Sequence, residues 1–134
     1  MDKIKASFDF DGTIEIPNIK SYAKYLVDCG HEIWIITSRF SNEECNKLER
    51  LRVINSNEKV FQTAIDCGIS KNNIKFMNFQ DKIDFIEKEG GFLFHLDDDD
   101  LEISFINDES DDDCVGVSTE SDWLTICNNL IKNI

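Results

Sequence analysis

Residues 4–13 read IKASFDFDGT, an apolar segment that runs directly into two aspartates, a glycine and a threonine. Ile4, Ala6 and Phe8 are typical of a buried strand, and Asp9 and Asp11 follow at its end. The turn after a strand needs only one such polar residue. A second nearby carboxylate adds repulsion unless a proton or a cation lies between the two. The stretch therefore predicts a buried strand that ends in a site with a positively charged partner.

The rest of the chain alternates between short apolar runs and segments with helical periodicity. Strands are predicted at residues 4–9, 32–37, 74–77, 92–96 and 114–118. Helices are predicted around residues 19–27, 41–52, 57–67, 83–89 and 121–132. Strands separated by helices imply right-handed crossovers and a parallel sheet covered on both faces. We therefore predict one α/β domain over residues 1–134, a three-layer Rossmann-like fold with a five-stranded parallel sheet.

Composition narrows the class of protein further. The 134 residues carry a formal net charge of −13, which disfavours binding to a nucleic-acid duplex and favours attraction of divalent cations. No segment approaches the roughly 20 apolar residues of a membrane span. The first residues, MDKIKAS, lack the pattern of a signal peptide. The five cysteines form no C-x-x-C pair, so we expect free thiols and a cytoplasmic protein.

Acids, hydroxyls and cations gather where the predicted strands end, and ligands of such sheets bind beyond these carboxyl ends. They are Asp9 and Asp11 after the first strand, Thr37, Ser38 and Arg39 after the second, Asp97 and Asp98 after the fourth, and Lys82 before the fourth. Carboxylates are the ligands that Mg²⁺ prefers, together with waters and a phosphate. Hydroxyls and a lysine suit a phosphoryl group. The pattern predicts a metal-assisted phosphoryl-transfer site.

The same residues admit other interpretations. Taken singly, each has an ordinary structural explanation: residues 11–12 fit a turn, and residues 37–38 fit a cap for the following segment. Lys82 fits a solvated surface charge, and residues 97–100 fit the start of a helix. An EF-hand is excluded because residues 108–116, DESDDDCVG, have no glycine at the sixth position. A receiver domain needs an aspartate after its third strand, where this chain reads FMNFQ at residues 76–80.

Four segments resemble the motifs of the haloacid dehalogenase (HAD) superfamily, whose members are mostly Mg²⁺-dependent phosphatases. DFDGT at residues 9–13 resembles the first motif, and IIT at 35–37 resembles the second. Lys82 matches the third, with Lys71 and Lys88 as alternatives, and FHLDD at 94–98 resembles the fourth. The motifs occur in the order of the superfamily and span most of the chain.

The resemblance implies a role for each matching residue. Asp9 would be the nucleophile that forms an aspartyl-phosphate, and Asp11 would act as general acid and then general base. The metal would bind the Asp9 carboxylate, the backbone carbonyl of Asp11 and Asp98, with Asp97 behind them or as an alternative ligand. Lys82 would offset negative charge.

The remaining candidates would hold the phosphate. Thr37 would donate to a phosphoryl oxygen, and Gly12 would let the chain turn close to the phosphate. Thr13, Ser38 and Arg39 complete the predicted phosphate- and substrate-binding set.

Short connections after the first and second motifs indicate a member without a cap domain, most similar to small nucleotidase-like phosphatases. We therefore expect a Mg²⁺-dependent phosphomonoester hydrolase acting on a small phosphorylated metabolite, including a nucleotide. One alternative is a polynucleotide 3′-phosphatase, in which Arg39, Lys71, Lys75 and Lys82 would form a basic patch. The other is a non-enzymatic module that binds phosphate or metal. The sequence does not determine the oligomeric state.

Overall fold

The computed structural model describes residues 2–47 and 57–134, and this part of the chain contains five strands. They are β1 (Lys5–Phe8), β2 (Glu32–Thr37), β3 (Ile74–Phe76), β4 (Phe94–Asp97) and β5 (Val115–Ser118). The strands form one parallel sheet in the order β3-β2-β1-β4-β5. The predicted α/β fold with a five-stranded parallel sheet is confirmed.

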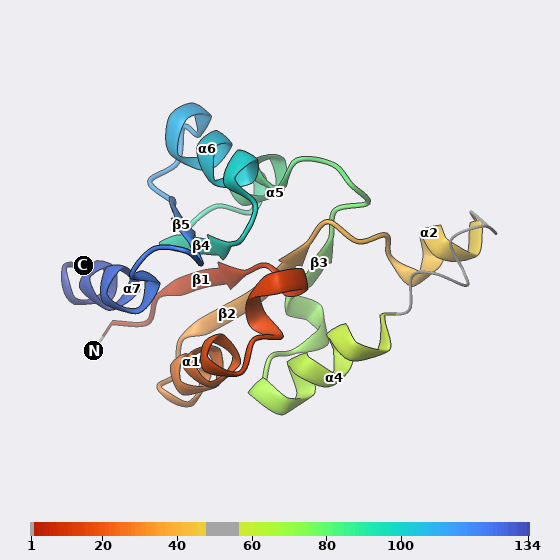
Figure 1. Cartoon of the computed structure of the whole chain (residues 1–134), viewed down its shortest axis with the longest axis horizontal. Coiled ribbons are helices and arrows are strands. Elements are labelled where there is room, and N and C mark those ends of the chain that lie inside the picture. The colour runs from red at the N-terminus through yellow and green to blue at the C-terminus, as the bar shows by residue number, and fades with distance from the viewer. Residues whose placement is uncertain (1, 48–56) are drawn as a thin grey trace.

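The order of the strands creates a crevice beside β1, the central strand. Ser7 of β1 pairs with Trp34 of β2 on one side and with His95 of β4 on the other. The chain builds outward from β1 through β2 to β3, and then returns to place β4 and β5 on the opposite side (Figure 1). The connection that follows β1 therefore leads to one side of this strand, and the connection that enters β4 leads to the other side. Ligands of such folds bind at the point between β1 and β4 where the direction changes.

Helices cover both faces of this sheet. They are α1 (Pro17–Asp28), α2 (Asn42–Lys47), α4 (Glu58–Cys67), α5 (Lys82–Glu89), α6 (Asp100–Glu109) and α7 (Trp123–Lys132). A turn at Phe10–Ile14 follows β1, and a short 3₁₀ turn at Lys71–Asn73 precedes β3. Figure 1 shows α1, α4 and α7 on one face of the sheet and α5 and α6 on the other, with α2 beyond the β3 side.

Alternating side chains of the strands fill two separate cores. In β2, Ile33 and Ile35 pack in the core beneath α1 and α4, whereas Trp34 and Ile36 pack in the core beneath α5 and α6. This alternation follows from the period of two along a strand, and burial on both faces explains the continuous apolar run of β2.

Two helices differ from the sequence expectation. α6 is not evident from apolar periodicity, because Leu101 on this helix is exposed and the acidic Glu102 is buried. The helix predicted at residues 41–52 is present as α2 up to Lys47, and its remainder lies outside the described residues.

Neither a cap domain nor a membrane-crossing helix occurs in the described ranges. The connection from the Phe10–Ile14 turn to α1 contains only two residues, Glu15 and Ile16. Between β2 and β3, the described residues form only α2, α4 and the 3₁₀ turn. Among residues 2–47 and 57–134, no helix has the length and apolar character needed to cross a bilayer.

Candidate active site

The central strands bring the predicted acids together at their carboxyl ends. Asp9 immediately follows β1, and its backbone N–H donates to the carbonyl of Leu96 on β4 at 2.9 Å. Asp97 ends β4, and Asp98 is the next residue. A hollow of about 360 Å³ opens there, and its lining consists of Asp9, Asp11, Ser38, Lys82, Asp97, Asp98 and Asp99. The sheet therefore places residues that are almost ninety positions apart around one cavity.

Lys82 is the cation at the centre of this cluster. Its Nζ atom lies 2.8 Å from Oδ1 of Asp9 and 2.7 Å from Oδ2 of Asp97. The Lys82 side chain is only 2% exposed, and both carboxylates are buried. A buried lysine is stable only with such partners, because transfer of an unpaired charge out of water costs several kcal/mol. Lys82 thus links the nucleophile candidate to β4.

The cluster has more negative than positive charge. Asp9, Asp97 and Asp98 would carry three negative charges when ionised, against one positive charge on Lys82. Burial raises the pKa of Asp9, Lys82 pulls that pKa down and Asp97 raises it again, so that it reaches about 8. In the absence of a metal ion, a proton on Asp9 relieves part of the repulsion. The site is therefore suited to exchange a proton for a cation.

Asp97 accepts three hydrogen bonds from within the protein. Its Oδ2 atom contacts Nε2 of His95 at 2.8 Å as well as Lys82, and its Oδ1 atom accepts from the backbone N–H of Asp99 at 3.0 Å. Burial works against ionisation of Asp97, but the hydrogen bond from His95 and the charge and hydrogen bond of Lys82 lower its pKa overall. Asp97 is thus an ionised anchor for Lys82, with little capacity left for a metal ion.

His95 supports Asp97 from within β4. A carboxylate only accepts, so Nε2 of His95 carries the proton, and Nδ1 accepts from the Ser7 hydroxyl at 2.8 Å. Complete burial lowers the pKa of His95, although Asp97 opposes that effect, and the ring stays neutral. The sequence analysis did not include His95 among the site residues. The only signal for this contact was its position two residues before Asp97 on one face of a strand.

The donor set fits a divalent cation. Asp9, Asp97 and Asp98 each offer a carboxylate oxygen, and these oxygens all lie within 4.8 Å of one another. Gly12 has a φ of +74°, and a Cβ atom at this position would collide with the Asp98 carboxylate. The glycine therefore opens the space in which Asp98 approaches the turn after β1. Asp97 already accepts from three protein donors and Asp9 from two, so Asp9 and Asp98 are the carboxylates better placed to bind a metal.

A residue that the sequence analysis did not identify positions Lys82. The buried side chain of Glu102, on α6, accepts from the backbone N–H of Lys82 at 3.1 Å. This N–H belongs to the first turn of α5, where helix donors have no partner within the helix. Burial raises the pKa of Glu102, and the contact with Lys82 opposes that rise. Glu102 thus fixes the start of α5 from a neighbouring helix.

Arg39 and Asp11 form a pair at the rim of the hollow. Nε and Nη2 of Arg39 donate to the two oxygens of Asp11 at 2.8 and 2.7 Å. The guanidinium carbon also lies 4.9 Å from the centre of the Phe10 ring. The hydrogen bonds with Asp11 raise the pKa of Arg39 further above its ordinary value. Arg39 therefore holds Asp11 in this state of the protein.

The hydroxyl candidates lie at different depths. Thr13 is buried and donates to Oδ2 of Asp9 at 3.3 Å, so it orients the nucleophile candidate. Thr37 is buried, and its hydroxyl oxygen accepts from the N–H of Arg39 at 3.3 Å. Ser38 lines the hollow itself. Their contacts with a phosphate remain predictions.

The structure distinguishes between the candidate lysines. Lys82 contacts Asp9, whereas Lys71 precedes the amino end of β3 and Lys88 is exposed near the end of α5. Of the residues of the alternative basic patch, Lys82 is buried, Arg39 is paired with Asp11 and Lys71 lies before the amino end of β3, away from the hollow.

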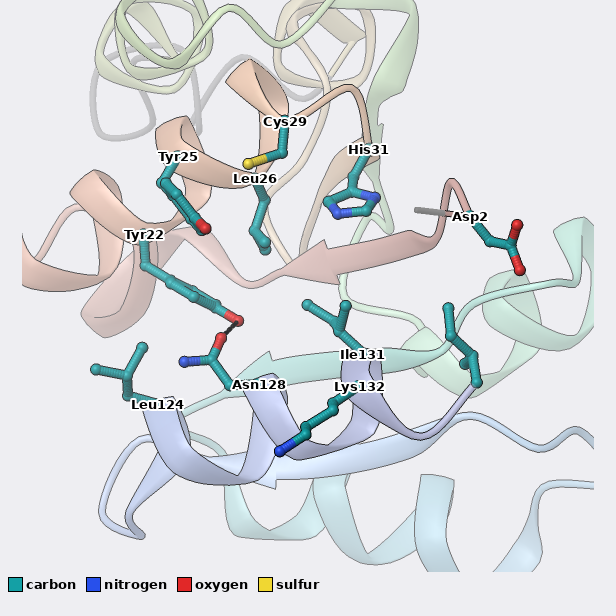
Figure 2. A pocket seen from close by; sticks show the side chains of 11 residues that line it. Asp2, Tyr22, Tyr25, Leu26, Cys29, His31, Leu124, Asn128, Ile131 and Lys132 are labelled. Carbon is teal, nitrogen blue, oxygen red and sulfur yellow. Dashed lines mark hydrogen bonds between the residues drawn. The ribbon is translucent and has the colours of Figure 1, made fainter.

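A larger cavity of about 700 Å³ lies away from these carboxylates, between α1 and α7 (Figure 2). Its lining includes Tyr22, Leu26 and His31, and the Tyr22 hydroxyl donates to Oδ1 of Asn128 at 2.7 Å across the gap. The Nδ1 atom of His31 accepts from the backbone N–H of Ile4. His31 directly precedes β2 and Asp2 lies before β1, and the cavity shares no lining residue with the acidic hollow, so the two are separate.

Comparison with known proteins adds no family assignment: neither the protein-family models nor the curated proteins searched gave a match.

Proposed function

We propose that this protein is a Mg²⁺-dependent phosphomonoester hydrolase of the HAD type that acts on a small phosphorylated metabolite. The observation that carries the proposal is the cluster of Asp9, Asp97 and Asp98 around the buried Lys82 at the carboxyl edge of the sheet. The order of Asp9, Asp11, Lys82 and Asp98 along the chain is also that of the HAD phosphatases.

A purely structural role explains the cluster poorly. Buried ion pairs contribute little net stability, and a surplus of buried carboxylates reduces it. Apolar residues of similar size would give a more stable end to β1 and β4. Strongly perturbed ionisable groups that line a cavity are, in contrast, frequent in active sites. The raised pKa of Asp9, caused mainly by burial, is of this kind.

Asp9 and Asp98 would hold the metal, with the backbone carbonyl of Asp11 as a further ligand. When bound, Mg²⁺ would supply positive charge that keeps Asp9 ionised and stabilises the phosphoryl oxygens. Thr13 and Lys82 orient the two oxygens of Asp9 through the contacts described above. The chain thereby presents a carboxylate whose position is fixed on both sides.

The reaction uses two steps at phosphorus. An oxygen of Asp9 attacks phosphorus, the bond to the leaving alcohol oxygen breaks, and that oxygen takes a proton from Asp11. Water then attacks the phosphorus of the aspartyl-phosphate and gives a proton to Asp11, which releases inorganic phosphate and restores Asp9. Arg39 holds both oxygens of Asp11 before substrate binds. The substrate phosphate attracts Arg39, and Asp11, once released, takes up from solvent the proton that it then donates to the leaving oxygen.

We favour a small substrate over a polynucleotide end. The net charge of −13 repels a phosphate backbone, and the basic residues that would offset it locally are buried, paired or remote. We also place the protein in a reducing compartment such as the cytoplasm, because its five cysteines are free thiols and four of them are buried.

The test is phosphate release from p-nitrophenyl phosphate and a panel of sugar phosphates and nucleotides, with Mg²⁺ or with EDTA. The expected result is turnover that requires Mg²⁺ and is lost in Asp9→Asn. Asp100→Asn is the matched control, since Asp100 is an exposed acid three residues from Asp97 and does not line the hollow. Absence of turnover on the whole panel would favour a non-enzymatic binding module.

A further inference from the structure

We propose that Phe79, backed by Phe40, is a stacking platform that selects phosphate esters carrying a planar aromatic group, such as the base of a nucleoside monophosphate. This inference rests on the proposed phosphatase function and specifies its substrate class. The proposal rests on the position of this aromatic pair next to Ser38, which lines the acidic hollow, and on the exposure and backbone conformation of Phe79.

Two loops at the carboxyl edge of the sheet supply the pair. Phe40 follows Arg39 after β2, and Phe79 precedes Lys82 in the loop after β3. The ring centres are 5.0 Å apart and the rings are tilted by 51°. The backbone N–H of Phe79 donates to the carbonyl of Ser38 at 2.8 Å, and Ser38 lines the hollow. The Phe79 backbone is therefore one hydrogen bond from a residue of the candidate phosphate site.

Phe79 is 70% exposed, so burial does not explain the presence of a large apolar ring at this position. Phe40 packs against part of the ring, and much of the rest faces solvent. Aromatic faces of this kind bind nucleic-acid bases by stacking, and the contact tolerates any base because each has a π-face. A planar group attached to a phosphate at the hollow can stack on this ring.

The backbone of Phe79 is strained. Its φ is +63°, and that of the preceding Asn78 is +54°. Asparagine tolerates this left-handed region, whereas a phenylalanine there is unusual and unfavourable. Such strain persists only where the surroundings enforce it, and it concentrates at functional sites. Here the surroundings enforce the strained conformation on a residue whose ring is exposed and not buried.

Hydrogen bonds between the two loops enforce the conformation. The N–H of Asn78 donates to the carbonyl of Arg39 at 3.2 Å, and the N–H of Ser41 donates to Oδ1 of Asn78 at 2.9 Å. The N–H of Met77 donates to the carbonyl of Thr37 at 2.8 Å. The platform is thus pre-organised relative to the strand end that carries the phosphate site, which reduces the entropy lost on binding.

The test compares adenosine 5′-monophosphate with ribose 5-phosphate, which has the same phosphate and sugar but no base. The Phe79→Asn variant removes the ring and tolerates the positive φ, whereas Phe79→Tyr retains the ring. Ile65→Ala on α4 is the matched control, because Ile65 is a similarly exposed apolar residue, at 71%, away from the site. The readout is kcat/KM for each compound, with Mg²⁺ present.

The expected result is that the unmodified protein prefers the nucleotide by at least about fivefold. In Phe79→Asn, kcat/KM should fall about fivefold or more for the nucleotide and stay within about twofold for ribose 5-phosphate. The Phe79→Tyr and Ile65→Ala variants should keep the preference. Equal use of both compounds by the unmodified protein, or an equal loss for both in Phe79→Asn, would overturn the platform.

Failure of the proposed function gives a different result. If neither compound is hydrolysed, the phosphatase proposal fails, and the platform is then tested by isothermal titration calorimetry of the same two compounds. An unchanged ratio of dissociation constants between the unmodified protein and Phe79→Asn would refute it. A 3′-phosphorylated oligonucleotide processed more than about tenfold better than the mononucleotide would also refute it, because the ligand would then be a polynucleotide.

Discussion

Replacing Asp9 by asparagine should stabilise the metal-free protein while abolishing its activity. Asparagine has nearly the same shape as a protonated aspartate, and its side-chain oxygen can still accept from Lys82. The pKa of Asp9 in the folded protein is about 8, against 3.8 for an ordinary aspartate, mainly because the residue is buried. The unfolded chain thus ionises Asp9 at neutral pH, whereas the folded chain keeps the proton.

The direction and size of the effect follow from this difference. A folded-state pKa above the unfolded value gives a contribution to stability that is complete below pH 3.8 and is lost as the pH rises towards 8. Each pKa unit corresponds to about 1.4 kcal/mol, so unmodified Asp9 loses a few kcal/mol by pH 7 and less by pH 5. The asparagine side chain of the variant has no proton to exchange in this range. The variant should therefore be more stable by about 2–4 kcal/mol at pH 7 and by less at pH 5.

The assay is thermal unfolding in EDTA at pH 5 and pH 7, followed by circular dichroism. For a chain of this length the difference at pH 7 corresponds to an increase in Tm of about 10 °C. Mg²⁺ at about 100 times its Kd should stabilise the unmodified protein by about 2.7 kcal/mol and the variant by much less. A variant that is less stable than the unmodified protein at pH 7, or a difference independent of pH, would refute the electrostatic reasoning.

Three further substitutions test individual contacts. Gly12→Ala should reduce Mg²⁺ affinity at least about tenfold by titration calorimetry, since a Cβ atom there would displace Asp98 and the backbone has a positive φ; unchanged affinity would remove Asp98 from the metal site. Glu102→Ala should lower the free energy of unfolding, measured in urea, by about 1–3 kcal/mol because the Lys82 N–H loses its acceptor. Glu102→Gln should retain most of the stability, and an equal loss in both variants would show that the hydrogen bond is unimportant. Arg39→Ala should change unfolding stability by less than about 1 kcal/mol, as its ion pair is partly exposed, but should raise KM for phosphate esters at least about fivefold; an unchanged KM would exclude Arg39 from phosphate binding.

The fold was predictable because its signals are local. The apolar run of residues 32–37 marks a strand buried on both faces, and the structure has β2 at those residues. Asp9 and Asp97 were identifiable as neighbours because each ends a strand, and parallel strands place their carboxyl ends at one edge of a sheet. Strand ends thus carry most of what the sequence reveals about this site.

Contacts that depend on side-chain direction were not predictable. Glu102 lies on α6, whose exposed Leu101 and buried acid invert the usual pattern, and only the packing of α6 beside α5 brings it to Lys82. The pairing of Arg39 with Asp11 joins two loops whose relative position no local pattern fixes. The same holds for Phe79, which reaches the β2 loop through a positive φ that phenylalanine rarely adopts.

The central claim is that the carboxylate of Asp9 attacks phosphorus, and covalent trapping tests it most directly. The protein is mixed with p-nitrophenyl phosphate and Mg²⁺, quenched in acid and reduced with sodium borohydride, which converts an acyl phosphate to homoserine. Peptide mass spectrometry should then detect homoserine in place of Asp9, dependent on substrate and Mg²⁺. Turnover with no modification of Asp9, or with the modification at another aspartate, would contradict the account.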